Sequence, residues 1–158
     1  MAVLKKNYKD INDTLKHIRL QIEESLPFAL NYCPKFKDPY TLFLWLKPQL
    51  KYRKDPNETE LLQSFPTLMK RNFYGVPGMG DCDCFSIGAV SACAVQNWKD
   101  CKIWIKLAGR NKFYPVHIWS GVTINGKDYP LDFTNKLPGI ERNYPYIQKI
   151  EVKKLKSN

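Results

Sequence analysis

The sequence has no long apolar segment and no apolar leader. No stretch approaches the roughly 18 consecutive apolar residues of a membrane span, and residues 1–6 (MAVLKK) lack the apolar run of a signal peptide. Repeats, low-complexity tracts and linker-like composition shifts are absent too. The chain has 158 residues, of which 44% are hydrophobic and 13% aromatic. This size and composition predict one compact domain. We expect it not to be membrane-associated and not to be exported by a signal peptide.

The cysteines do not follow the spacing patterns of metal sites or disulfide frameworks. The five cysteines are an odd number at uneven spacing, without a Cys-x-x-Cys pair, which favours reduced thiols. Cys82, Cys84 and His117 could together bind zinc, but Cys-x-Cys is unusual spacing and no second pair supports it. We therefore expect no metal and no cofactor. The remaining cysteines are interpreted as small apolar core residues: Cys33, Cys93 and Cys101.

Positive charge is in excess, with 25 Lys and Arg against 15 Asp and Glu, a formal net charge of +10. This balance permits binding to a polyanion by counterion exchange. No nucleic-acid-binding motif accompanies it. A solvated basic surface is therefore the simpler interpretation, and a specific polyanion site stays open as the alternative.

The first half of the chain has helical patterns. Apolar residues recur at three- and four-residue steps over residues 8–26, which predicts an amphipathic helix limited by Pro27. Residues 38–39 (Asp-Pro) are typical of an N-cap followed by the first helical residue. Residues 55–56 repeat this signal before residues 60–63. We therefore expect two short helices at these places.

The second half begins with a buried helix and continues with strands. A glycine-punctuated loop leads into small and apolar residues that predict a helix over residues 82–97. Beyond residue 100 the period changes to about two, and the Asn-Gly pair at 125–126 is a strong hairpin signal. The predicted strands are 102–107, 114–124, 127–133 and 146–152. Helices followed by strands predict an α+β fold with a mostly antiparallel sheet.

Three residues carry the chemistry that the pattern suggests. Cys82 opens the predicted helix, where unpaired N–H groups and the helix dipole favour the nucleophilic thiolate. His117 lies in a predicted strand, and Asp132 lies on the strand after the hairpin turn, so both can share one face. Such a carboxylate can hold the imidazole tautomer. Alone, such a histidine is more often structural and such an aspartate a turn former; together the three favour a Cys-His-Asp triad.

Three motifs in this order resemble a known superfamily. They are residues 78–85 (GMGDCDCF), His117 among alternating apolar residues, and residues 129–132 (YPLD). They resemble the transglutaminase-like and papain-like cysteine proteases, above all the small bacterial and phage-borne members, whose nucleophile lies in a Gly-Asp-Cys-Asp-Asp type motif. The resemblance covers about residues 60–135. It implies a buried, Cys-bearing helix packed on an antiparallel sheet that presents His and Asp.

The resemblance also implies roles and a domain plan. By position, Cys82 is the expected nucleophile, His117 the general base and acid, and Asp132 the residue that orients the imidazole. The backbone N–H of Cys82 would supply one oxyanion-hole donor. Within the single domain, residues 1–58 are expected to form a helical N-terminal part and residues 59–158 the catalytic core.

Three more residues belong to the expected site, and one further position departs from the family pattern. Gln63 is a candidate for the second oxyanion donor, although papain-type glutamines lie nearer the cysteine. Trp119 should share the face of His117 and line a substrate cleft, with core packing as the alternative. Asp83 is expected to cap the helix or to contact substrate. Cys84 departs from the family pattern, because many relatives carry Asp or Glu there.

Fold does not determine function in this superfamily. We therefore carry three hypotheses: a thiol protease or amidase, a protein-crosslinking transglutaminase, and a non-catalytic phage virion module that retains the fold. The intact triad favours an enzyme. Expected partners are a protein or peptide substrate and, by resemblance, virion proteins. The expected setting is the cytoplasm of a bacterial or phage-infected cell, or a virion, and the sequence leaves the oligomeric state open.

Overall fold

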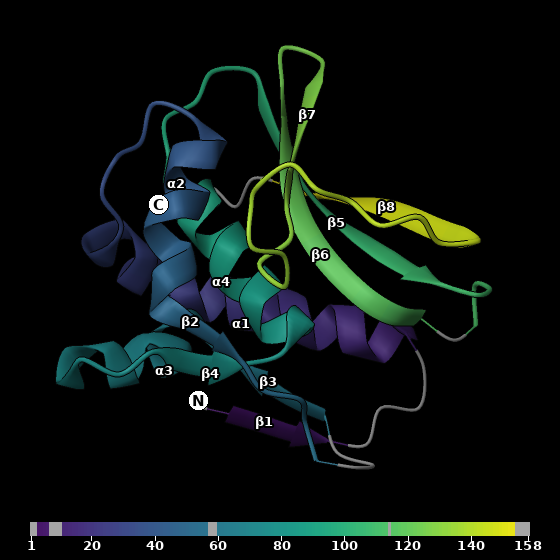
Figure 1. Cartoon of the computed structure of the whole chain (residues 1–158), viewed down its shortest axis with the longest axis horizontal. Coiled ribbons are helices and arrows are strands. Elements are labelled where there is room, and N and C mark those ends of the chain that lie inside the picture. Colours follow the sequence, from purple (N-terminus) through teal and green to yellow (C-terminus); the bar gives the residue numbers. More distant parts are fainter. Residues whose placement is uncertain (1–2, 7–10, 57–59, 114, 154–158) are drawn as a thin grey trace.

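The structure, a computed structural model, describes residues 3–6, 11–56, 60–113 and 115–153 (Figure 1). It contains both helices and strands, so the predicted α+β class is confirmed. The helices are α1 (Ile11–Tyr32), α2 (Pro39–Leu46), α3 (Phe65–Met69) and α4 (Cys82–Ala94), with 3-10 turns η1 (Lys47–Gln49) and η2 (Lys70–Tyr74). The strands are β1 (Val3–Lys6), β2 (Leu50–Tyr52), β3 (Glu60–Gln63), β4 (Gly78–Gly80), β5 (Cys101–Gly109), β6 (Pro115–Ile124), β7 (Lys127–Leu131) and β8 (Tyr146–Val152).

The main sheet has four strands in the order β7-β6-β5-β8, and each neighbouring pair is antiparallel. These strands match the four predicted ones, except that β7 ends at Leu131 and Asp132, which was predicted to lie on it, follows its last residue. Tyr114, the predicted start of the second strand, lies outside the described residues. Two small pairs were not predicted: β1 with β3, antiparallel, and β2 with β4, parallel. Strands this short show no period in sequence. Both pairs join residues 1–58 to residues 59–158.

The first helix continues past the proline that was predicted to limit it. Pro27 lies inside α1, which ends at Tyr32. Packing compensates for the lost backbone N–H, because Ala29 is fully buried and the Phe28 ring contacts the rings of Tyr32 and Phe65 at 4.9 and 5.3 Å. Tertiary burial therefore outweighs the local preference of the residue before proline.

The two Asp-Pro signals have different outcomes. The first is confirmed, because Asp38 Oδ1 accepts a hydrogen bond from the Thr41 backbone N at 2.8 Å and α2 begins there. The second prediction is wrong, because residues 60–63 form strand β3. Asp55 Oδ2 instead accepts a hydrogen bond from the Leu61 backbone N at 2.6 Å. The same residue type thus satisfies a strand N–H, a partner that the local sequence cannot reveal.

Helix α4 lies at the centre of the fold and packs against α1, β5 and β6 (Figure 1). Every residue from 83 to 93 is buried. The helix ends at Ala94, three residues before its predicted end. Among the described helices, none combines the length and apolarity needed to cross a bilayer. The core therefore forms around the helix that begins at Cys82.

The opposite face of the main sheet has its own small aromatic cluster. Trp104 and Trp119 are 1% and 2% exposed, and they pack with Ala108 and Tyr144. The Nζ of Lys106 lies 4.7 Å from the centroid of the Trp104 ring. Residues alternate between the two faces along each strand. Both faces are therefore covered near the centre of the sheet.

Gly121 is needed where the Trp104 ring crosses β6. A Cβ at position 121 would lie 2.3 Å from two atoms of that ring. The ring is also held, because its Nε1 donates to Thr123 Oγ1 at 3.0 Å. We expect Gly121→Ala to lower the free energy of unfolding by about 1–3 kcal/mol through overpacking, measured by urea denaturation.

The matched control for this prediction is Gly88→Ala inside α4. The nearest atom to a Cβ there is a Phe65 ring carbon at 3.2 Å. Alanine also gains about 1 kcal/mol of helix propensity over glycine. The control should therefore cost less than Gly121→Ala, and equal costs would contradict the role assigned to the Trp104 ring.

Candidate functional site

Strand β4 leads to Cys82. It lies so close to neighbouring residues that only glycine fits at positions 78 and 80. A Cβ on Gly78 would lie 2.2 Å from the Leu68 backbone O, and one on Gly80 would lie 2.7 Å from the Cys84 Cβ. Asp81 then occupies the N-cap position of α4, but its side chain makes no capping hydrogen bond. Cys82 follows as the first helical residue and is half-buried.

The structure brings His117 and Asp132 together. His117 lies on β6, Asp132 follows the last residue of β7, and the His117 Nε2 lies 2.7 Å from Asp132 Oδ2. The second carboxylate oxygen accepts hydrogen bonds from the Thr134 backbone N at 3.0 Å and from Thr134 Oγ1 at 2.7 Å. Asp132 is 3% exposed. The carboxylate is therefore buried with both oxygens bonded, an arrangement that fixes the imidazole.

Hydrogen bonding outweighs burial at Asp132. Burial raises its pKa, but hydrogen bonds from His117 and Thr134 lower it more, so the pKa lies below its ordinary value. Lys47 lies near Asp132. Burial lowers the pKa of Lys47, and the charge of Asp132 acts in the opposite direction. The Lys47 Nζ donates to the Phe133 backbone O at 2.5 Å. The residue after Asp132 is thereby tied to the end of α2.

Two aromatic rings stack on the imidazole of His117. The His117 ring stacks on Trp119 with centroids 5.4 Å apart at 22°, and on Tyr144 at 6.1 Å. The Trp119 Nε1 donates to Glu141 Oε2 at 2.8 Å, and that oxygen lies 2.7 Å from the Lys106 Nζ. Trp119 therefore shares the face of His117 as expected, and its ring is buried beneath Tyr144 and the 132–145 segment.

The thiol of Cys82 is not stabilised as a thiolate. Its pKa is raised to about 12, first by burial and then by the charges of Asp83 and Asp81, while a backbone hydrogen bond from Ile118 acts against this rise. The sequence-based expectation of a stabilised thiolate is therefore wrong for this structure. Ile118 is the residue next to His117, so the Cys82 sulfur contacts β6, the strand that carries His117. The described hydrogen bonds include none between Cys82 and His117.

The other predicted residues gather around Cys84. The Gln63 Nε2 donates to the Met79 backbone O at 2.7 Å and lies 3.7 Å from the Cys84 sulfur, so its amide is engaged on that side. Asp83 is 6% exposed, and its Oδ1 accepts a hydrogen bond from the Cys84 backbone N at 2.6 Å. The Cys84 thiol donates to the Leu61 backbone O at 3.0 Å. Position 84, where the resemblance led us to expect Asp or Glu, is thus occupied by a buried thiol that donates a hydrogen bond.

One set of donor atoms near the helix start lies close enough to approach a single cation. One side-chain atom each from Asp81, Asp83 and Cys84 lies within 4.8 Å of the others. The Cys84 thiol is a hydrogen-bond donor in this structure, so the set offers two carboxylates. Structural metal sites in proteins use four or more ligands. This set falls short of one.

Tyr52 and Lys47 were missed by the sequence analysis. Tyr52 is 53% exposed on β2, where it pairs with Gly80. Its pKa is raised by burial and then by the charges of Cys82 and Asp81, so the phenol lies near the thiol. Both residues approach the site through contacts between distant segments, and no local pattern signals such contacts.

No protein-family model matches this chain, and neither a curated protein nor a solved structure is significantly similar to it.

The buried carboxylate of Asp132 should contribute to stability in a pH-dependent way. Asp132→Asn removes a charge-assisted hydrogen bond, and we expect it to lower the free energy of unfolding by about 1.5–3 kcal/mol at pH 7. Because the folded pKa of Asp132 is depressed, its contribution is present above the unfolded value of about 3.9 and is lost as the pH falls through the folded pKa. Urea titrations from pH 7 to pH 3 should show the two proteins converging.

Asp128→Asn is the control for this experiment. Asp128 is paired with Lys149 at 2.9 Å, but both side chains are about 40% exposed. An exposed pair contributes about 0–1 kcal/mol. A loss at Asp132 no larger than the loss at Asp128 would contradict the buried network.

The raised pKa of Cys82 should make its thiol slow to react near neutral pH. With a pKa of about 12, Cys82 should react slowly with iodoacetamide at pH 7.5, and the rate should rise about tenfold per pH unit up to pH 9 or beyond. Asp83→Asn removes a charge that raises this pKa, so labelling at fixed pH should become faster. Peptide mapping by mass spectrometry measures both rates. Fast, pH-independent labelling of the wild type would contradict a protonated resting thiol.

Proposed function

We propose that this chain is a cysteine-dependent acyl-transfer enzyme with a papain-like or transglutaminase-like fold, acting as a thiol protease or amidase on peptide or amide bonds. The observation that carries the proposal is the buried His117–Asp132 pair, 2.7 Å apart. It lies one residue from the backbone that bonds the Cys82 sulfur. The site contains a cysteine at the start of a helix, a histidine on a strand and a buried carboxylate that holds the histidine. These are the groups that serve as nucleophile, general base and orienting residue in cysteine-dependent acyl transfer.

The proposed mechanism follows from which ring nitrogen is engaged. With Nε2–H donating to Asp132, the Nδ1 of His117 keeps a lone pair and accepts the Cys82 proton. The thiolate attacks the amide carbonyl, and the backbone N–H of Cys82 stabilises the oxyanion. The amine then leaves with the proton from Nδ1. Water hydrolyses the thioester with the same imidazole as base, and Cys82 regains its proton.

The reaction needs a proton transfer that the resting site does not favour. The carboxylates of Asp81 and Asp83 oppose a lone thiolate, whereas a thiolate paired with the imidazolium of His117 is neutral overall. Approach of Nδ1 to the sulfur is therefore part of the proposed catalytic cycle. The half-exposed Tyr52 phenol beside the thiol is the proposed contact for the substrate segment next to the cleaved bond.

A non-catalytic phage or virion module is the second candidate function. The observations that favour it are the raised pKa of Cys82 and the lack, among the described residues, of a hydrogen bond from this thiol to His117. The Cys84 departure points the same way. The setting in a bacterial cell, a phage-infected cell or a virion belongs to both candidates and rests on the resemblance alone.

Three reactions tested side by side distinguish the candidates. Wild type is incubated with casein to detect new amine termini, with a glutamine peptide to detect ammonia, and with the same peptide plus a fluorescent primary amine to detect crosslinking. We expect amide cleavage that Cys82→Ala reduces by about 10⁴-fold or more. Cys101→Ala, another half-buried cysteine, should retain it.

The pattern of products decides between hydrolase and transferase. Amine incorporation that exceeds hydrolysis would identify a crosslinking transglutaminase, because water and amines compete for one acyl-enzyme. A wild type that matches a normally folded Cys82→Ala protein in all three reactions would refute the enzyme and leave the non-catalytic module.

A further inference from the structure

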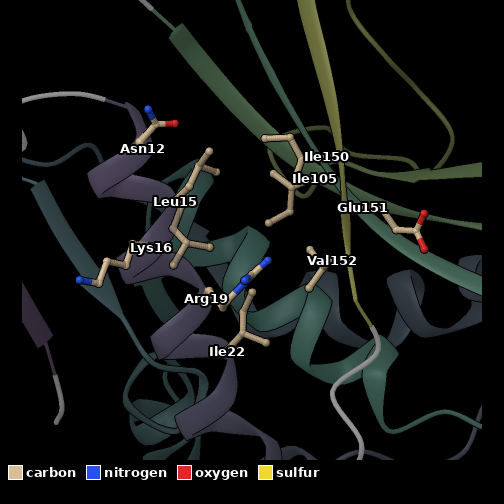
Figure 2. A pocket seen from close by; sticks show the side chains of 10 residues that line it. Asn12, Leu15, Lys16, Arg19, Ile22, Ile105, Ile150, Glu151 and Val152 are labelled. Atoms are coloured by element: carbon tan, nitrogen blue, oxygen red, sulfur yellow. The ribbon is translucent and has the colours of Figure 1, made fainter.

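A pocket of about 290 Å³ lies between α1 and the edge of the main sheet formed by β5 and β8 (Figure 2). Its interior is aliphatic, and three of its residues, Ile18, Ile22 and Ile105, are buried in the core. Half-buried Leu15, Ile150 and Val152 form the walls. The volume is near the lower end of small-molecule sites. It is separate from the catalytic residues proposed above.

One cation points into this aliphatic space. Figure 2 shows the Arg19 guanidinium directed between α1 and β8, whereas the charged ends of Lys16 and Glu151 point away from the pocket. Among the residues that the structure describes, Arg19 has no ion-pair partner. A guanidinium donates in a planar fork that matches a carboxylate. The pocket thus pairs an apolar floor with a guanidinium that is directed into it.

We propose that this pocket binds a medium-chain fatty carboxylate, with the chain on the isoleucine floor and the carboxylate on Arg19. A methylene is about the size of a water molecule, whose share of liquid volume is about 30 Å³, so the cavity holds a chain of roughly eight to ten carbons. An aliphatic chain needs no hydrogen-bond partners inside the pocket. A peptide would bring amide groups that this lining leaves unpaired at a cost.

The test compares ten-carbon probes that differ only in their head group. Isothermal titration of the full chain with decanoate, decanol and decyltrimethylammonium is done at pH 7.5, with each probe below its micelle concentration. We expect decanoate to bind at least about tenfold more tightly than decanol, because only decanoate gains a charge-assisted hydrogen bond. The cationic probe should bind most weakly.

Variants locate the site. Arg19→Gln should weaken decanoate binding about tenfold and leave decanol unchanged, while Lys16→Gln, which removes a charge of the same sign one turn away, should change either by less than twofold. Val152→Trp fills the mouth and should abolish binding of both probes, with its fold checked by circular dichroism.

Several results would overturn the proposal. Equal affinity for decanoate and decanol would mean that Arg19 only covers the apolar wall with its stem. Equal losses in Arg19→Gln and Lys16→Gln would indicate diffuse attraction to a basic surface. Tighter binding of an acidic peptide ending in leucine would make this a peptide site, and no binding below the micelle concentration would remove the ligand class. None of these outcomes depends on whether Cys82 is catalytic.

Discussion

The complete burial of α4 is the constraint on which the rest of the structure depends. Residues 83–93 are all buried, so this helix has no polar face, and α1 and the sheet must both supply apolar surface to it. The glycines of β4 allow the preceding chain to approach at distances that exclude any side chain. The half-buried residues of the helix are its two ends, Cys82 and Ala94, and Cys82 is the one at the N-terminal end.

The same burial creates an electrostatic conflict at Cys82. A helix N-terminus contributes about 0.3–1 kcal/mol to a nearby anion, less than the 1.36 kcal/mol that corresponds to one pKa unit. Desolvation of a buried group can shift a pKa by several units, and Asp81 and Asp83 add repulsion in the same direction. Burial and repulsion therefore outweigh the dipole at Cys82. The position of a cysteine in the sequence indicates the dipole but not the other two effects.

The local features of the fold were predictable, and the contacts between distant segments were not. The four main strands follow from a period of two with a hairpin signal, and α2 follows from its Asp38 cap. Pro27 inside α1 and the strand at 60–63 depend on tertiary partners that override local preference. In the site, the sequence indicated the meeting of His117 and Asp132 through the hairpin register. The positions of Lys47 and Tyr52 depend on packing that no local pattern encodes.

The alternation of β6 explains why the sulfur meets a backbone group and not the imidazole. Ile118 faces the core beneath α4, so its neighbours His117 and Trp119 face the aromatic cluster on the other side of the sheet. The thiol and the imidazole thus approach β6 from opposite faces. In the described pairing, β7 pairs with β6 only from Ser120 to Ile124, and at Ile118 the Cys82 sulfur bonds the backbone.

The proposed mechanism therefore requires the imidazole to reach around this edge of β6 to meet Cys82. The hydrogen bond from His117 to Asp132 lies at the same edge, because Asp132 follows the last residue of β7, and it can persist while the ring turns about it. The stacking on Trp119 and Tyr144 opposes that turn. Aromatic pairs contribute about 0.5–1.5 kcal/mol beyond their area, an amount that substrate contacts at the thiol can supply. In the proposed mechanism, the packing of these rings would set how readily His117 reaches Cys82.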